Sequence, residues 1–425
     1  MIFHRLCRIF LNQRSLFALW ATVTAVTAHS NPLPERFTRP DNAVEVLTGF
    51  NPNKTDFMQK LGLHFGGWVA FGYTHNFDSS DNFNTPTDWI AFRNDRVLLN
   101  QINLFLERAV DTEGGHWDLG GRVDVMYGSD SPFTQAFGLE ISDEGKQKWI
   151  GDTDKSHNLN KLALPQFYLE VYAPVLNGIT AKFGHFYPIT GYYALPAPAR
   201  FFYTPTYTVQ FGEPFSHTGA LFSMPLVDNL SITVGAVNGW DNFSANIDDA
   251  WNFIGGLNWD NGIEGNGATS VTLTAIHGTP ELKEDTTRSH YSIVLDHYVT
   301  DQFHFVLQHD HGWDSIENVN DDPHWYGIIG HLFYDINDML AIGTRMEWFR
   351  DEGGIRTQEA GIRAISTGKS TNYYAMTFGL NVMPTNWFKI RPEIRYDWAE
   401  NSNPFDEGSQ DDQLMFSVDA VINLF

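Results

Sequence analysis

Cysteine is almost absent from this sequence, because Cys7 is the only one among 425 residues. It lies in an N-terminal segment with three arginines, followed by the apolar run 15–26 and by small residues up to Ala28. This order is typical of a secretory signal peptide, so we predict that residues 1–28 are removed on export. The rest of the chain then has no disulfide, no thiolate nucleophile and no zinc–cysteine site.

Long apolar runs and positive charge are also scarce. No stretch after the signal approaches the roughly 18 apolar residues that a membrane-spanning helix needs. The chain has 27 Lys and Arg against 51 Asp and Glu, a formal charge of −24 at pH 7. Such an acidic balance argues against nucleic acid as a partner and against a polybasic surface.

A two-residue alternation of apolar and charged side chains is the main signal that the sequence does carry. In residues 386–399, one parity is apolar (Phe388, Ile390, Pro392, Ile394, Tyr396, Trp398) and the other is charged (Lys389, Arg391, Glu393, Arg395, Asp397). Successive side chains of a strand point to opposite faces. Because this pattern recurs to the last residue of an exported chain without a spanning helix, we predict an all-β fold. The expected fold is a transmembrane antiparallel β-barrel with lipid outside and water inside.

About sixteen segments read as strands, and their connections alternate in length. The segments are 61–77, 97–109, 116–128, 162–173, 178–187, 215–225, 229–240, 250–260, 268–278, 288–300, 302–313, 324–335, 338–350, 371–383, 386–399 and 412–425. Short connections such as 299–301 and 336–338 alternate with long ones such as 129–161 and 188–214. Short periplasmic turns and long extracellular loops are the layout of bacterial barrels, and an even strand number places both termini in the periplasm.

The predicted organisation is a signal peptide, a polar and proline-rich periplasmic extension at 29–60, and an outer-membrane barrel at 61–425. Pro392 has no N–H to donate to a neighbouring strand, so we expect a bulge or a local break in the ladder there. Phe425 ends an amphipathic strand and resembles the C-terminal aromatic read by the outer-membrane assembly machinery. The match is partial, since the third residue from the end is Asn423.

Several segments resemble the OmpL-like β-barrel porins. They are ALPQFYLEVYAP (163–174), GITAKFGHFYPITGYYALPAP (178–198) and FFYTPTYTVQFGEPFSHTG (201–219), preceded by GGWVAFGYTHNF (66–77) and GGRVDVMYGSD (120–130). The resemblance is densest over residues 61–240 and implies a Gram-negative outer-membrane porin, a passive channel without a cofactor. It implies little about the solute, which we expect to be small and hydrophilic. The other expected partners are lipid, lipopolysaccharide and the assembly machinery, and a homo-oligomer is possible.

Strand parity identifies the side chains that would line a pore. The charged candidates are Glu107, Asp118, Arg122, Asp124, Glu170, Lys182, Arg345, Glu347, Lys389, Arg391, Glu393, Arg395, Asp397 and Asp419. Segment 188–214 holds five prolines among many aromatics, so it is too rigid and apolar for a free surface loop. We expect it either to fold against the barrel wall and narrow the pore or to cap the rim. The constriction candidates are Tyr192, Arg200, Tyr203, Tyr207 and Glu213.

Other functions find less support in the sequence. The histidines at 290, 297, 304, 309 and 311 show no convergence of three or four ligands, so we expect no metal site. An embedded hydrolase lacks a G-x-S-x-G elbow, and Ser216 and His217 are adjacent and point to opposite strand faces. A closed barrel that acts as an adhesin or structural anchor stays open as the alternative to a porin.

Overall fold

The structure is a computed structural model that describes most of the chain after the predicted signal peptide. The described residues are 42–78, 91, 93–142, 144–149, 159–244, 251–280, 286–317, 322–359 and 369–425. The predicted signal peptide and the first part of the predicted extension lie outside them.

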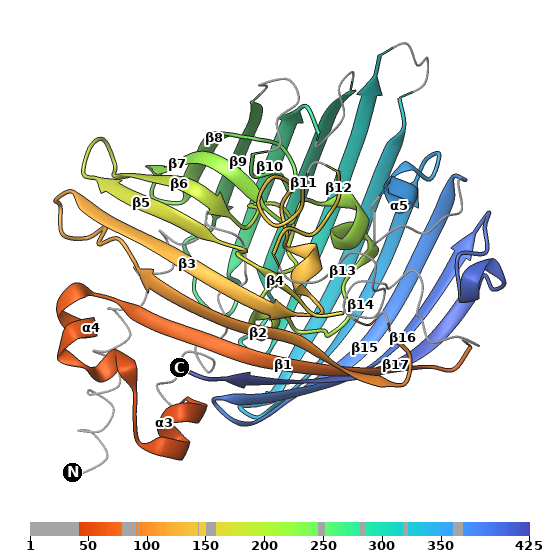
Figure 1. The fold of residues 1–425 in the computed structure, drawn as a ribbon, viewed down its shortest axis with the longest axis horizontal. Coiled ribbons are helices and arrows are strands. Elements are labelled where there is room, and N and C mark those ends of the chain that lie inside the picture. Colours follow the sequence, from red (N-terminus) through yellow and green to blue (C-terminus); the bar gives the residue numbers. More distant parts are fainter. Residues whose placement is uncertain are drawn as a thin grey trace.

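Strands form a single antiparallel wall that closes on itself (Figure 1). They are β1 (His64–Asn76), β2 (Arg96–Arg108), β3 (Asp118–Gly128), β4 (Lys161–Ala163), β5 (Phe167–Ala173), β6 (Ile179–Phe186), β7 (His217–Val227), β8 (Leu230–Val237), β9 (Asn252–Asp260), β10 (Thr269–Gly278), β11 (Thr286–Tyr298), β12 (Phe303–Ile316), β13 (His324–Asn337), β14 (Leu340–Asp351), β15 (Thr371–Thr385), β16 (Phe388–Glu400) and β17 (Asp412–Asn423). The barrel closes where β1 pairs with β17, from Trp68↔Asn423 to Asn76↔Met415. Because β4 and β5 occupy one position beside β3, the seventeen segments make a barrel of sixteen strands.

The predicted strands and the alternation of their connections are confirmed. One predicted strand, 162–173, is divided into β4 and β5 by residues 164–166. Pro165 lies in this interruption and has no N–H for the ladder with β3, which explains the gap. The break expected at Pro392 is also present, because the β15–β16 ladder pairs Gly379 with Glu393 and then Val382 with Ile390. Leu380 and Asn381 of β15, and Arg391 and Pro392 of β16, are therefore unpaired in that ladder.

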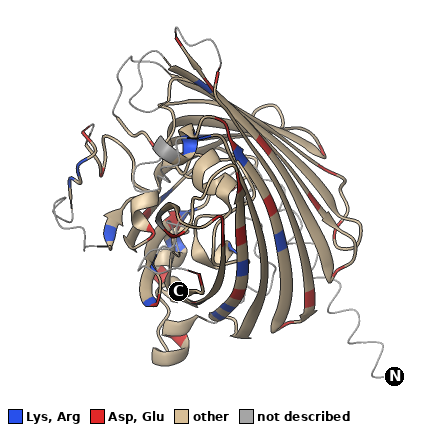
Figure 2. Cartoon of the chain, turned by 90° about the vertical axis from the view of Figure 1, so that its right-hand side faces the viewer, with Lys and Arg blue, Asp and Glu red and all other residues tan. Residues whose placement is uncertain are grey.

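The two faces of the wall differ as the alternation predicts. On β16 the outward side chains of Ile394 and Tyr396 are 52% and 40% exposed, whereas the inward Arg391 and Arg395 are each 1% exposed. Bands of positive and negative residues follow one another along neighbouring strands in Figure 2. The apolar face therefore forms a belt around the barrel, and the charges lie within it.

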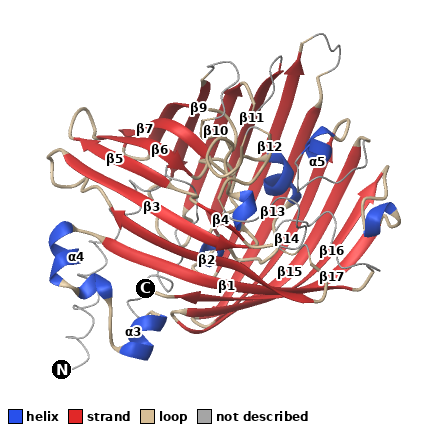
Figure 3. Ribbon diagram, in the orientation of Figure 1, coloured by secondary structure: helices blue, strands red, loops and turns tan. Residues whose placement is uncertain are grey.

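Helices are short and lie outside the strand wall or in its connections (Figure 3). They are α3 (Ala43–Thr48), η2 (Pro52–Lys54), α4 (Asp56–Leu61), η3 (Ser131–Phe133), η4 (Ala197–Ala199), the π-helix η5 (Thr208–Gly212), α5 (Ile355–Glu359) and η7 (Asp406–Gly408). Among the described helices, none is long and apolar enough to cross a membrane. The Asn42 side chain accepts a hydrogen bond from Glu45 N at 2.8 Å and so caps α3.

The two ends of the described chain meet at one end of the barrel. Val44 N donates to Leu424 O at 3.2 Å, so the start of α3 is tied to the chain's C-terminus. The ring of Phe425 lies 4.9 Å from that of Phe65 at the beginning of β1. The short turns between β5 and β6, β7 and β8, β11 and β12, β13 and β14, and β15 and β16 lie at this same end.

Candidate functional site in the barrel interior

Residues 188–214, which connect β6 to β7 and are called here the inner segment, lie inside the ring of strands (Figure 1). Prolines interrupt regular structure along it, which leaves short helical turns and many backbone groups without helical or sheet partners. Buried backbone groups need hydrogen-bond partners. In this barrel, charged side chains of the wall supply them.

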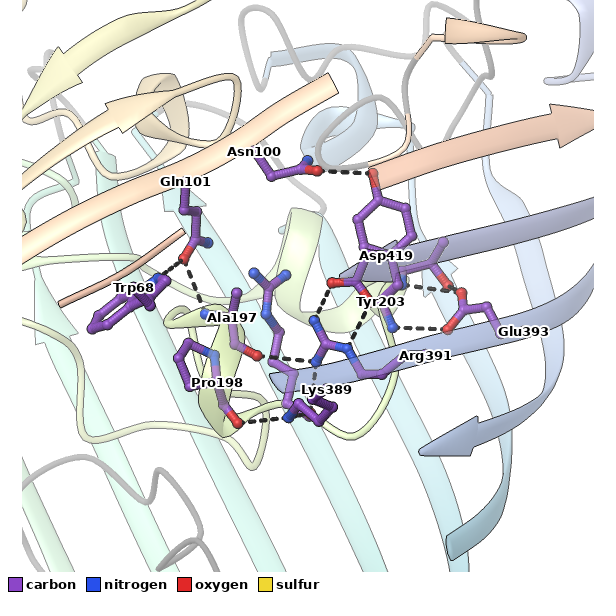
Figure 4. Close-up of polar contacts among 12 residues, drawn as sticks. Trp68, Asn100, Gln101, Ala197, Pro198, Tyr203, Lys389, Arg391, Glu393 and Asp419 are labelled. Carbon is purple, nitrogen blue, oxygen red and sulfur yellow. Dashed lines mark hydrogen bonds and ion pairs between the residues drawn. The ribbon is translucent and has the colours of Figure 1, made fainter. Parts of the chain in front are cut away.

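Two cations of β16 hold the first half of the inner segment. Lys389 Nζ donates to the carbonyl oxygens of Pro198 at 2.7 Å and Arg200 at 3.1 Å. Arg391 Nη1 donates to the carbonyl oxygens of Ala197 at 3.0 Å and Arg200 at 2.6 Å. Figure 4 shows Lys389 pointing from the wall at the carbonyl of Pro198 and Arg391 at that of Ala197. The positive side chains are therefore engaged by the protein's own backbone.

A carboxylate on the same strand holds the next turn of the inner segment. Glu393 accepts hydrogen bonds from Tyr203 N at 2.8 Å and Thr204 N at 3.0 Å, and from the Thr204 hydroxyl (Figure 4). Tyr203 reaches across to the other side of the barrel seam, where its hydroxyl donates to Asn100 Oδ1 of β2 at 3.3 Å. The segment thus bridges the first and last parts of the wall.

On β14, Glu347 binds the start of η5 in the same way. It accepts hydrogen bonds from Tyr207 N at 2.8 Å, Thr208 N at 2.7 Å and the Thr208 hydroxyl at 2.8 Å. Arg345 Nη1, two residues earlier, donates to Thr204 O at 2.8 Å. Free amides at the start of a helical turn favour a negative partner.

The remaining inward charges of this region pair with one another. Arg391 forms a two-point ion pair with Asp419 of β17. Arg395 Nε lies 2.8 Å from Asp397 Oδ1. Arg395 also contacts the inner segment, because its Nη1 donates to Pro205 O. Eight of the charged side chains on β14, β16 and β17 contact the inner segment or one another and are called here the sealed stripe: Arg345, Glu347, Lys389, Arg391, Glu393, Arg395, Asp397 and Asp419. They comprise four cations and four anions, and none is more than 6% exposed.

Wall glycines leave room for the inner segment. A Cβ added to Gly72 of β1 would lie 2.1 Å from the Tyr203 hydroxyl oxygen, and one added to Gly327 of β13 would lie 2.3 Å from Thr208 Oγ1. Neither distance is possible for a real side chain. The approach of the inner segment therefore depends on glycine at these wall positions.

The other predicted pore-lining charges form a separate group on β2, β3, β5 and β6, called here the β2–β6 patch: Glu107, Asp118, Arg122, Asp124, Glu170 and Lys182. Arg122 Nε lies 2.6 Å from Asp124 Oδ1, and its Nη1 lies 3.3 Å from Glu107 Oε2. Lys182 Nζ lies 3.9 Å from Glu170 Oε1. The side chains of Glu107, Arg122 and Glu170 are 30%, 16% and 14% exposed, so this group is wetter than the sealed stripe.

The two charges of the inner segment itself have partners on other parts of the chain, that of Arg200 in the connection after β3 and that of Glu213 on β12. Arg200 Nη2 lies 3.4 Å from Asp130 Oδ2, and both side chains are 2% exposed. Glu213 Oε1 accepts from Gln308 Nε2 of β12 at 2.7 Å. Burial, and next the neighbouring Asp310, raise the pKa of Glu213. Of the predicted constriction residues, Arg200, Tyr203, Tyr207 and Glu213 are buried and Tyr192 is half-buried.

An aromatic cluster fills the interior beside the inner segment, and the sequence reasoning did not single it out. Trp240, Trp325, Phe211, Phe349 and Tyr373 are each at most 1% exposed and belong to one apolar core. Two guanidinium groups lie over its tryptophans, since Arg288 is 4.9 Å and Arg356 is 5.2 Å from the Trp240 ring centroid. The available signal was inward parity, which places Trp325, Phe349 and Tyr373 on the polar face of their strands.

Among the described residues, no three His, Cys, Asp or Glu side chains are placed to hold a metal ion. His290 Nε2 instead lies 3.1 Å from Asp310 Oδ2, and His311 Nε2 lies 3.0 Å from His324 Nδ1. These contacts are pairs within the wall.

Comparison with known families accounts for this architecture. Residues 62–424 match the family described as "Putative beta-barrel porin-2, OmpL-like". The chain belongs to this porin family. It is therefore an outer-membrane porin, with the barrel wall in the membrane. A search of curated protein sequences finds no significant relative.

Solved structures with the same fold are distant in sequence from this porin. The anion-selective porin from Comamonas acidovorans is 9% identical with a TM-score of 0.56, over 85% of this chain and 99% of that chain. The outer membrane channel DcaP of Acinetobacter baumannii is 13% identical with a TM-score of 0.54, over 85% and 96%. The trimer form of OmpT, an outer membrane protein of Vibrio cholerae, is 13% identical with a TM-score of 0.53, over 85% and 98%. At such identities the likeness concerns the fold alone.

Proposed function

We propose that this porin is a passive diffusion channel for small hydrophilic solutes and ions, narrowed by the inner segment. Family membership supports the channel, and the contacts of Glu393, Glu347, Lys389 and Arg391 with residues 197–208 support the narrowing. A segment held at several points by buried charges is fixed in place, because each contact is a charge-assisted hydrogen bond. The proposal includes no catalytic activity and no cofactor.

Single-channel recording in planar bilayers tests this proposal. The refolded protein should give stepwise conductance, and deletion of residues 192–210 should raise the conductance of each step. A shortened extracellular connection, such as removal of 402–404 between β16 and β17, serves as the matched control. A deletion variant that folds and conducts like the parent would contradict the narrowing role.

The second candidate is a barrel that conducts poorly and acts as an adhesin or structural anchor. The observation that favours it is the aromatic cluster of Trp240, Trp325, Phe349 and Tyr373, which fills part of the interior. The same recording decides between the two. A correctly folded protein that never conducts would favour the anchor.

We also propose how the porin is exported and assembled and which partners it contacts. Residues 1–28 would direct export, Phe425 would be read by the barrel-assembly machinery, and the apolar belt would contact lipid and lipopolysaccharide. A homo-oligomer is proposed because one solved barrel of this fold is described as a trimer. Crosslinking of the purified protein in detergent micelles would measure its oligomeric state.

A further inference from the structure

The charged side chains of the interior fall into two groups that differ in their access to solvent. We propose that the β2–β6 patch, and not the sealed stripe, sets the ion selectivity of this porin, and that it favours small cations and amine-bearing solutes over anions. This inference rests on the proposed function as a diffusion channel.

The side chains of the sealed stripe are shielded from the pore and together carry no net charge. Its four cations and four anions balance, and all are buried behind the inner segment. Lys389, Arg391, Arg345 and Arg395 each donate to backbone carbonyl oxygens of that segment. A charge whose field is cancelled by near neighbours, and which is buried behind that segment, exerts little force on an ion passing beyond it.

The β2–β6 patch carries an uncompensated negative charge. Asp118 is paired with Arg108 at the strand ends, with Arg108 Nη2 lying 2.8 Å from Asp118 Oδ1. Three carboxylates then remain, Glu107, Asp124 and Glu170, against the two cations Arg122 and Lys182. One negative charge is therefore in excess.

Glu107 is the group at which this excess is most accessible. Arg122 lies closer to Asp124 than to Glu107, at 2.6 Å against 3.3 Å, and the Glu107 side chain is 30% exposed. Its carboxylate is the most exposed of the three and shares its cation with Asp124. Glu170 is the most weakly paired of the three, because its cation, Lys182, lies 3.9 Å away.

Aromatic rings keep the two cations of the patch against the wall. The Arg122 guanidinium carbon lies 3.9 Å from the Phe105 ring centroid, and Lys182 Nζ lies 4.1 Å from the Tyr168 ring centroid. Cations prefer this position over an aromatic face. A passing ion therefore meets carboxylate oxygens in preference to the guanidinium and ammonium groups, and a potassium ion or a primary ammonium group is attracted there.

Reversal potentials in a KCl gradient test the inference. The parent protein should be cation-selective, and E107Q/E170Q should lower the permeability ratio of potassium to chloride about fivefold, about 1 kcal/mol at 1.4 kcal/mol per tenfold. E107K should shift the ratio in the same direction. The control E144Q/E317Q also removes two negative charges, from exposed positions on extracellular connections, and should change the ratio less.

Each outcome of this experiment is decisive. An anion-selective parent, or an E107Q/E170Q variant with the parent's reversal potential, would overturn the inference while leaving the channel itself established. A larger shift in E144Q/E317Q would assign selectivity to the loops and would also overturn it. Absence of conductance in the folded parent would instead contradict the proposed function, so the two failures are distinguishable.

Discussion

Glu393→Gln tests how the inner segment is held in the barrel. The Glu393 carboxylate accepts from two consecutive amides, Tyr203 N at 2.8 Å and Thr204 N at 3.0 Å, and from the Thr204 hydroxyl. Glutamine has nearly the same shape, but its NH2 group must face one of these donors. One hydrogen bond to a charged group is lost, worth about 1.5–3 kcal/mol, and the remaining bonds become neutral and weaker. A total near 3 kcal/mol corresponds to about a hundredfold change in the docking equilibrium.

Hydrogen exchange measured by mass spectrometry reports this equilibrium directly. Protection of the amides of residues 203–208 should fall about a hundredfold, while the amides of β16 and β17 keep theirs. Glu400→Gln is the matched control, because Glu400 lies on the same strand, is exposed and accepts a hydrogen bond from Tyr374 Oη at 3.1 Å, away from the inner segment. Its effect should stay within about 0.5 kcal/mol. Unchanged exchange at 203–208 in the Glu393 variant would refute the assignment of this carboxylate as an anchor.

Three further outcomes are expected. Gly72→Ala should destabilise the refolded protein by about 1–3 kcal/mol in urea unfolding, because its Cβ would lie 2.1 Å from the Tyr203 hydroxyl. The control Gly330→Ala should be tolerated, because its Cβ would lie 3.6 Å from Leu307 Cδ2. An equal loss of stability in the two variants would contradict the contact between Gly72 and Tyr203. Since burial, and then Asp310, raise the pKa of Glu213 above its ordinary 4.5, the docked segment binds a proton more readily than the released one. Docking of the inner segment should then weaken as pH rises from 4.5 through the raised pKa of Glu213, and the protection factors of residues 206–212 should fall. Glu213→Gln should abolish this pH dependence. Docking that tightens over this range would show that Glu213 is not its cause. Phe425→Ala should reduce the fraction of folded barrel in the outer membrane, measured by heat-modifiable gel migration. If the variant assembles as fully as the parent, Phe425 is not an assembly signal.

The strands could be predicted from sequence because a wall between lipid and a polar interior imposes a two-residue period on every strand. Pro392 showed in advance where a ladder breaks, whereas Pro165 lay within a strongly alternating segment, and its interruption of the strand was missed. The inward parity of Arg391 and Glu393 was predictable, but their partners were not. Those partners are backbone groups of a segment about 190 positions away, and periodicity carries no information on such contacts.

The composition of the inner segment indicated only that it would not be a free loop. Whether it capped the rim or entered the barrel depended on the wall, where Gly72 and Gly327 leave space and Glu347 and Glu393 supply acceptors. A glycine on the inward parity of a strand is the sequence signal that could have indicated such an approach. It is weak taken singly, because strand glycines also occur at bulges.

The inner segment takes its partners from both ends of the chain, and this constrains the order of assembly. Ala197 N donates to Gln101 of β2, 96 positions earlier, while Glu393 of β16 lies 190 positions after Tyr203. Contacts this distant in sequence form late, because the intervening chain must first be ordered. A barrel intermediate without β16 and β17 would still hold the segment on its early strands but would lack its anchors on the late ones. The passage would reach its final width only when β16 has joined β15 and β17 has closed the barrel against β1.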